Sequence, residues 1–170
     1  MTCVESTTEI LLETRINASV EKCFDLARSI DFHLESARTT REQAVDGVTT
    51  GLISLGQEVE WKARHLGLWW RMRVKITEFD PPRRFQDTMI RGPFRSFSHD
   101  HTFDPCVSGT LMTDVVRFQS YVSVLGTLLD RLVVGQYLRR FLLSRNIKLK
   151  AAAEANARSA AETKNPYQPH

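Results

Sequence analysis

The sequence has few cysteines, and none of them form a paired motif. Cys3, Cys23 and Cys106 are odd in number and lack the C-x-x-C spacing of zinc and redox sites. We therefore expect free thiols in a reducing compartment, which indicates a cytoplasmic protein. The N-terminus agrees with that expectation, because it lacks the cationic and apolar segments of a secretory signal peptide.

Motifs for several kinds of chemistry are also absent. The sequence has no H-E-x-x-H, no G-x-S-x-G and no glycine-rich phosphate loop, so we expect no metal and no cofactor. The net charge of +3 includes no long polybasic run, which argues against nucleic acid as a partner. The most apolar segment, residues 122–134, is interrupted by Asp130 and Arg131 and is too short for a transmembrane span of about 20 apolar residues.

What the sequence does contain is strand-like alternation of apolar and polar residues, with one early helical segment. Val20, Cys23, Phe24 and Ala27 have helical spacing behind Ser19, a predicted N-cap, and a further helical turn is expected at residues 32–36. The predicted strands cover residues 9–16, 38–46, 57–65, 69–76, 85–89, 97–103 and 112–118. Short turns join most of them, which is typical of an antiparallel meander.

The third and fourth predicted strands should form a hairpin. Gly67 and Leu68 suit a two-residue turn between them. That turn would place Trp61 opposite Val74 on the inward face. It would also place residue 63 opposite residue 72.

The last part of the chain changes to helical periodicity. Residues 127–162 contain no proline and one glycine, Gly135, and predict one long helix that is apolar on more than one side. Its basic residues, Arg139, Arg140, Arg145, Lys148 and Lys150, are either a solvated face or a contact with an anionic membrane surface. Residues 163–170 are polar and contain two prolines, so we expect a disordered tail.

This order of elements resembles the helix-grip superfamily, often grouped as SRPBCC or START-like proteins, which includes lipid-transfer domains and polyketide cyclases. The resemblance runs from about residue 10 to residue 150. Its local motifs are Ala63-Arg64-His65-Leu66-Gly67, Phe79-Asp80-Pro81-Pro82-Arg83-Arg84-Phe85, Arg91-Gly92-Pro93-Phe94, His99-Asp100-His101-Thr102-Phe103 and Thr113-Asp114-Val115-Val116. It implies a single α+β domain over residues 1–170, in which a curved antiparallel sheet of six to seven strands grips the C-terminal helix around a cavity.

The inward faces of the predicted strands carry many large side chains, which either fill a core or wall the cavity that the resemblance implies. The candidate wall residues are Trp61, Trp70, Met72, Phe85, Met89, Phe97, Phe103, Met112 and Phe118, with Leu132 and Phe141 as a lid. If these side chains wall a cavity, the expected partner is a hydrophobic small molecule, such as a lipid, an isoprenoid or an aromatic polyketide.

Four polar residues, Asp87, His99, His101 and Asp114, are expected among these inward side chains. A five-residue turn at residues 105–109 would place His99 opposite Asp114, and a three-residue loop at Pro93 would place Asp87 opposite His99. A carboxylate fixes the tautomer of a neighbouring histidine and supports its charged form. The residues can be a structural hydrogen-bonded group, a contact to ligand, or an acid–base pair of His99 and Asp114 in a cyclase or dehydratase. For the protein as a whole, the alternative to a ligand-binding protein or an enzyme is a membrane-associated or protein-interaction module that uses the last helix.

Overall fold

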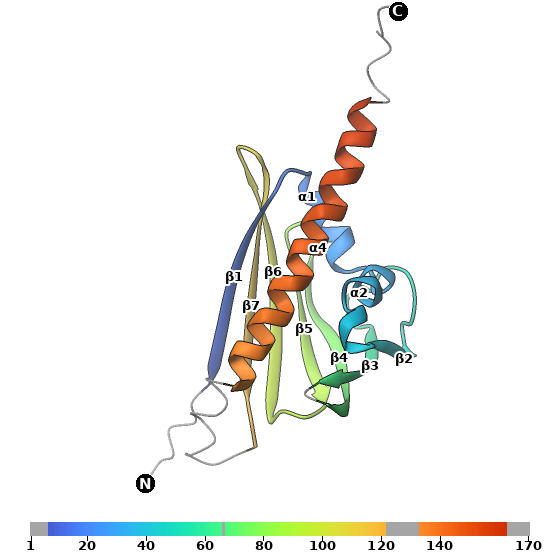
Figure 1. Ribbon diagram of the computed structural model, residues 1–170, viewed down its shortest axis with the longest axis vertical. Coiled ribbons are helices and arrows are strands. Elements are labelled where there is room, and N and C mark those ends of the chain that lie inside the picture. The colour runs from blue at the N-terminus through green and yellow to red at the C-terminus, as the bar shows by residue number, and fades with distance from the viewer. Residues whose placement is uncertain (1–6, 66, 122–132, 163–170) are drawn as a thin grey trace, which may run out of the picture.

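Seven strands form one antiparallel sheet in the computed structural model, which describes residues 7–65, 67–121 and 133–162 (Figure 1). The strands are β1 (Thr8–Ile16), β2 (Gln43–Gly47), β3 (Glu58–His65), β4 (Leu68–Asp80), β5 (Arg84–Arg91), β6 (Ser96–Cys106) and β7 (Gly109–Gln119). Their order is β1-β7-β6-β5-β4-β3-β2, so β2 to β7 form a meander and β1 pairs with β7. The predicted fold class, α+β with a curved antiparallel sheet, is confirmed.

The helices gather beside that sheet. α1 (Val20–Ala27) and α2 (Ile30–Ser36) follow β1, and a 3-10 turn, η1 (Arg38–Thr40), leads into β2. α4 (Gly135–Glu162) runs across the sheet and contacts β1, α1 and α2 (Figure 1). None of the helices within the described ranges is long and apolar enough to cross a membrane.

Two serines begin the short helices. Ser19 accepts a hydrogen bond from the backbone N–H of Lys22 at 3.4 Å, as the sequence predicted, and Ser29 accepts one from Phe32 at 3.2 Å. Each hydroxyl satisfies a backbone donor that has no partner within its helix. The second cap makes α2 begin at Ile30, two residues before the predicted helical turn.

The start of the second predicted strand differs from the structure. The strand predicted for residues 38–46 begins with the 3-10 turn, and extended backbone starts only at Gln43. The weak alternation of this polar segment gave no signal for its start. The predicted helix at residues 127–162 lies partly outside the described residues, and within them α4 begins at Gly135 after a π-helical segment at Val133 and Val134. The predicted disordered tail also lies outside them.

The predicted register of the β3–β4 hairpin is wrong by two residues. Trp61 lies opposite Met72 rather than Val74. The reason is that His65 pairs with Leu68, so Leu68 belongs to the strand and not to the turn. A shift of two residues keeps every side chain on its predicted face, because the side-chain period of a strand is two.

The β6–β7 hairpin shows the same kind of shift. β6 continues through Pro105, which pairs with Thr110, because a proline near a strand end removes only one donor from the ladder. His101 therefore lies opposite Asp114, where the prediction placed His99. The third prediction of this kind, Asp87 opposite His99, is confirmed.

The core under α1 is aromatic. The ring of Phe24 packs against Phe79, Phe85 and Phe103 at centroid distances of 5.5, 5.6 and 5.6 Å. Cys23, on the same helix, is buried as a free thiol. α1 therefore seals one end of the sheet with packed side chains.

The outer face of the sheet carries cross-strand charge pairs. Glu60 on β3 accepts from Arg71 at 2.8 Å and from Arg73 at 3.2 Å, both on β4. Cross-strand pairs of this kind stabilise a sheet by about 0.2–1 kcal/mol each.

We expect Gly109→Ala to destabilise the protein by about 3 kcal/mol in urea denaturation, because the backbone has no room for a side chain there. Gly109 has a φ of +128°, and an added Cβ would lie 2.4 Å from the carbonyl oxygen of Ile16 and 2.8 Å from the nitrogen of Ala18. The Thr110 hydroxyl holds the two backbone segments together here, because it donates a hydrogen bond to the Ala18 carbonyl at 2.8 Å.

Gly51→Ala is the matched control. Gly51 has a φ of +76°, yet nothing lies within 4 Å of an added Cβ. The control should lose only about 1 kcal/mol, the cost of the left-handed conformation itself. Equal losses in the two variants would contradict the packing argument.

Candidate functional site

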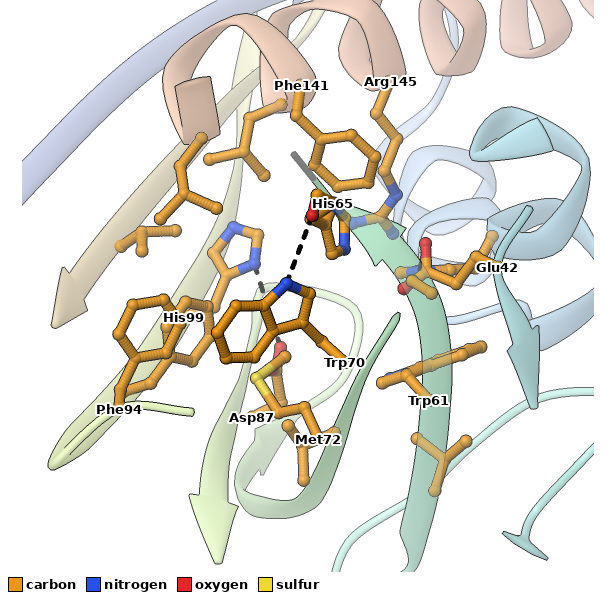
Figure 2. A pocket seen from close by; sticks show the side chains of 18 of the residues that line it. Glu42, Trp61, His65, Trp70, Met72, Asp87, Phe94, His99, Phe141 and Arg145 are labelled. Carbon is orange, nitrogen blue, oxygen red and sulfur yellow. Dashed lines mark hydrogen bonds and ion pairs between the residues drawn. The ribbon is translucent and has the colours of Figure 1, made fainter. Parts of the chain in front are cut away.

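A cavity of about 390 Å³ lies between the sheet and the helices (Figure 2). Its wall draws on the middle strands of the sheet, on α2 and on one side of α4. Most of the wall is aromatic or aliphatic, and Trp61, Trp70, Met72, Phe94 and Phe141 are among its largest side chains (Figure 2). This volume and lining are typical of a small-molecule pocket.

Many of the predicted contact residues line this cavity. They are Trp61, Trp70, Met72, Phe85, Asp87, Phe97, His101 and Phe141, and His99 joins them. Asp114 lies behind the two histidines and does not line the cavity. The alternation of the strands thus identified part of the aromatic wall, whereas Phe94, Tyr121 and Tyr137 also line the cavity and were not predicted.

Four other predicted wall residues, Met89, Phe103, Met112 and Phe118, do not line the cavity. Phe103, Met112 and Phe118 are at most 1% exposed and belong to the packed core. They share the inward face, but α1 covers the end of the sheet that carries Phe103 and Met112. The ring of Phe94 covers Phe118 at a centroid distance of 5.2 Å. The predicted lid residue Leu132 lies outside the described residues.

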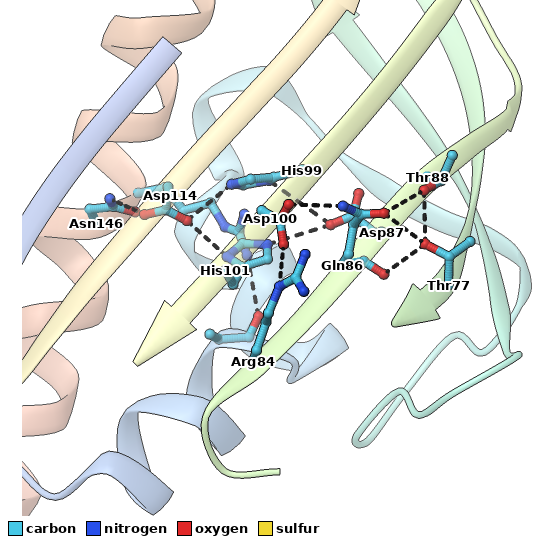
Figure 3. Close-up of polar contacts among 12 residues, drawn as sticks. Thr77, Arg84, Gln86, Asp87, Thr88, His99, Asp100, His101, Asp114 and Asn146 are labelled. Atoms are coloured by element: carbon cyan, nitrogen blue, oxygen red, sulfur yellow. Dashed lines mark hydrogen bonds and ion pairs between the residues drawn. The ribbon is translucent and has the colours of Figure 1, made fainter. Parts of the chain in front are cut away.

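Two histidines and two aspartates form a largely buried polar cluster at the cavity wall (Figure 3). Oδ1 of Asp114 is 3.0 Å from Nε2 of His99 and 2.8 Å from Nδ1 of His101. Oδ2 of Asp87 is 3.4 Å from Nε2 of His101 and 3.9 Å from Nδ1 of His99. Each imidazole therefore lies between two carboxylates, one on β7 and one on β5.

This cluster includes a set of groups that can bind a metal. Asp87, His99 and His101 each offer one donor atom, and these atoms lie within 4.8 Å of one another. The sequence places both histidines on one strand face through the His99-x-His101 spacing, and it predicts Asp87 opposite His99. It contains no metal-binding motif, so no metal was expected at this set.

Asn146 connects the cluster to the long helix. Its Nδ2 donates to Oδ2 of Asp114 at 2.7 Å and to Oγ1 of Thr14 at 3.2 Å (Figure 3). Asp114 is 2% exposed, so both of its oxygens depend on protein partners. One carboxylate thereby joins β6, β7 and α4.

The charges of the cluster follow from these contacts. Burial raises the pKa of Asp114, but hydrogen bonds from His101 and His99 outweigh burial and hold that pKa far below its usual range. Burial lowers the pKa of His99, and the neighbouring His101 lowers it further. Burial also lowers the pKa of His101, but hydrogen bonds to Asp114 and Asp87 outweigh it and raise that pKa. The two histidines thus differ in the protonation state they favour.

A second polar network lies on the opposite face of the same strands. Asp100, between the two histidines in sequence, accepts from Nε of Arg84 and from Nε2 of Gln86, both at 2.8 Å (Figure 3). Arg84 and Gln86 lie on β5. This network therefore joins β5 to β6 directly behind Asp87 and the histidines.

The sequence reasoning missed a polar group on another part of the cavity wall. Nε2 of His33 is 3.2 Å from Oε2 of Glu42, and the His33 ring stacks on Trp61 at 4.1 Å. Arg145 comes from α4, is 8% exposed and donates to the carbonyl of Ala27 at 3.4 Å. A helix that is apolar on several sides does not reveal which face is inward, so the sequence alone groups Arg145 with its basic neighbours.

The basic residues of α4 do not share one solvated face. Arg139 and Lys148 donate to backbone carbonyls of β1 and α2, and Arg145 lies in the cavity wall. Lys150 pairs with Glu154 at 3.8 Å. The membrane contact predicted for this helix stays a prediction, with fewer free cations than the sequence indicated.

A curved antiparallel sheet that holds a long C-terminal helix around a cavity defines the helix-grip class of proteins, the SRPBCC or START-like superfamily. The family model described as "Polyketide cyclase / dehydrase and lipid transport" matches residues 1–154. The chain belongs to this family, which confirms the resemblance seen in the sequence.

Solved structures of low sequence identity share the fold. TTHA0849 from Thermus thermophilus is 19% identical, with a TM-score of 0.67 over 86% of this chain and 99% of that chain. Ginseng major latex-like protein 151 from Panax ginseng is 15% identical, with a TM-score of 0.65 over 86% and 97%. The protein of unknown function SA2116 from Staphylococcus aureus is 11% identical, with a TM-score of 0.69 over 90% and 97%. No curated protein matches the chain. At these identities the likeness shows the fold alone.

We expect Asn146→Ala to lower the free energy of unfolding by about 2–3 kcal/mol, because it leaves one oxygen of a buried carboxylate without a donor. Ile147→Ala is the control, since that neighbouring side chain is 67% exposed and should cost under about 0.5 kcal/mol. Thermal or urea unfolding of both variants measures the difference. An Asn146→Ala protein as stable as the wild type would show that Asp114 does not need this partner.

Proposed function

We propose that the protein binds an apolar small molecule in the cavity between the sheet and α4. The observation that carries this proposal is the aromatic and aliphatic wall around about 390 Å³ of space. Removing about 300 Å² of apolar ligand surface from water would contribute about 7 kcal/mol at 25 cal/mol per Å², before the costs of association. Family membership supports the same function, since the family description includes lipid transport.

The lining also favours a particular kind of ligand. The aromatic side chains Trp61, Trp70, Phe94 and Phe141 suit flat or extended apolar groups, such as those of a lipid, an isoprenoid or an aromatic polyketide. Polar side chains occur at separate places on the wall, with Asp87 and its histidines at one and Arg145 at another. An amphipathic ligand would be oriented by these groups.

The expected result of adding a fluorescent fatty acid such as cis-parinaric acid is saturable binding at one site, with a change in the emission of Trp61 and Trp70. Ala63→Phe should weaken this binding at least tenfold, because Ala63 is 3% exposed and lines the cavity, so a phenyl ring there occupies ligand space. The measurement is a fluorescence titration, repeated by isothermal calorimetry.

Ala151→Phe is the matched control, since Ala151 lies on the exposed side of α4. It should bind as the wild type does. Native mass spectrometry of protein purified from its own cells tests for a bound ligand directly. The proposal is wrong if the wild type binds neither aliphatic nor aromatic probes, or if Ala63→Phe binds them unchanged.

We propose polyketide cyclase or dehydratase activity as a second candidate function. The specific observation is that His99 and His101, each between two carboxylates, line the cavity that would hold the substrate. A histidine held in this way can transfer protons to and from a bound β-ketone, as aldol cyclisation and dehydration require. Asp114 would orient the histidines without contact to substrate, since it lies behind them.

If the second function holds, His99→Gln should lower turnover of a poly-β-ketone mimic by about 100-fold or more while binding of the mimic changes little. His65→Gln is the control, because His65 lines the same cavity outside the cluster and pairs with the Tyr137 hydroxyl at 2.7 Å. Product formation is followed by liquid chromatography and mass spectrometry. Equal activity in wild type and His99→Gln would rule out this role.

A further inference from the structure

We propose that Asp87, His99 and His101 bind one divalent first-row transition-metal ion, such as Zn²⁺ or Fe²⁺, in the wall of the cavity. Two imidazole nitrogens and one carboxylate oxygen are a common protein ligand set for these ions. Such a metal site would be separate from the apolar wall and independent of which organic ligand the cavity binds.

The donor atoms are close to the spacing that such a site needs. Metal–ligand bonds of about 2.1 Å separate neighbouring donors of a tetrahedral site by about 3.4 Å. Oδ2 of Asp87 is already 3.4 Å from Nε2 of His101 and 3.9 Å from Nδ1 of His99. All three donor atoms lie within 4.8 Å of one another, so adjustments of the Asp87 and histidine side chains would be needed to bring the set to metal-binding distance.

The other nitrogen of each imidazole is held by a second carboxylate. Asp114 Oδ1 lies 3.0 Å from Nε2 of His99 and 2.8 Å from Nδ1 of His101. The hydrogen bond between Nε2 of His99 and Asp114 would leave a lone pair on Nδ1 of His99. A ring proton on Nδ1 of His101, which is in ion-pair contact with the same oxygen, would leave a lone pair on Nε2 of His101. A carboxylate behind each metal-binding histidine is the usual outer-shell arrangement of zinc sites. Asn146 fixes this carboxylate in turn.

Positive charge would be stabilised between Asp87 and the two histidines. In the tautomers that Asp114 favours, the lone pairs of both histidines face the carboxylate of Asp87. Like partial charges at this distance in a buried site repel unless positive charge lies between them. Among the residues that the structure describes, Asp87 and Asp114 form ion pairs only with these histidines, and the positive charge of Arg145 acts on Asp87 without an ion-pair contact. A metal ion bound between Asp87 and the histidines would supply that charge. A second proton on the His101 ring is the alternative source of positive charge.

The site would be open on one side. Asp87, His99 and His101 all line the cavity, whereas Asp114 does not. A metal held by these three residues therefore has its remaining coordination position toward the cavity, as catalytic zinc sites do. If the proposed apolar binding also holds, a carbonyl or enolate oxygen of the ligand would reach that position.

The test uses the full chain without a polyhistidine tag, treated with a chelator and then dialysed against Zn²⁺, against Fe²⁺ without oxygen, and against Mg²⁺. Mass spectrometry of the metals should show about one equivalent of Zn²⁺ or Fe²⁺ per chain and no Mg²⁺, because Mg²⁺ prefers all-oxygen sites. Zn²⁺ should also raise the melting temperature, since it binds only the folded state.

Variants locate the metal. Asp87→Asn and His101→Gln should each lose at least tenfold in Zn²⁺ affinity, and circular dichroism checks that they fold. His33→Gln and His65→Gln are matched controls, because both histidines line the cavity outside the set, and they should keep one equivalent. Co²⁺ should give visible bands of a four- or five-coordinate N/O site without a thiolate charge-transfer band, which excludes binding by Cys23 or Cys106.

Several results would overturn the proposal. They are no stoichiometric Zn²⁺ or Fe²⁺ on the wild-type chain, full retention of metal by Asp87→Asn and His101→Gln, or a Co²⁺ spectrum with thiolate bands. The first result would mean that a protonated His101, and not a metal ion, supplies the positive charge beside Asp87. Titration of cis-parinaric acid on the same samples reports apolar binding separately, so a failure of the metal site and a failure of the proposed function are told apart.

Discussion

One buried carboxylate holds the sheet and the long helix together. Asp114 on β7 uses one oxygen for the two histidines of β6 and the other for Asn146 of α4. A charge at 2% exposure is tolerated only because every oxygen has a partner. The place of α4 across the sheet, and hence the roof of the cavity, depends on this contact as well as on apolar packing.

The same contact explains why the cavity has a polar side. A pocket for an apolar molecule needs no buried histidines, and burying four ionisable groups costs free energy that packing must offset. Asp87, His99 and His101 nevertheless line the space, while the interior near α1 is sealed by phenylalanines. The fold therefore separates a packed end, which supplies stability, from an open end that retains polar groups.

The sequence predicted the fold class and the part of the aromatic wall that lies on strands, because strand faces depend only on a period of two. Both hairpin registers that were wrong were wrong by two residues, so Trp61, Met72 and His101 still faced inward. What the sequence could not predict depends on contacts between distant segments. Phe103 is covered by Phe24 of α1, and Arg145 turns inward from a helix with no clear polar side. Asp87, by contrast, was predicted opposite His99 although it comes from another strand, because one short loop sets that register.

The outer network of Asp100, Arg84 and Gln86 has a consequence for how this family can diversify. These residues lie on the outer face and link β5 to β6 at the level where the ladder pairs Asp87 with His99, so they help to hold the two strands that carry the cluster. Substitutions on the outside of the curved sheet could therefore retune the site without altering a single side chain that a ligand would meet. Selection for a new ligand or a new reaction would then act on two surfaces, the cavity wall and the outer face of the sheet.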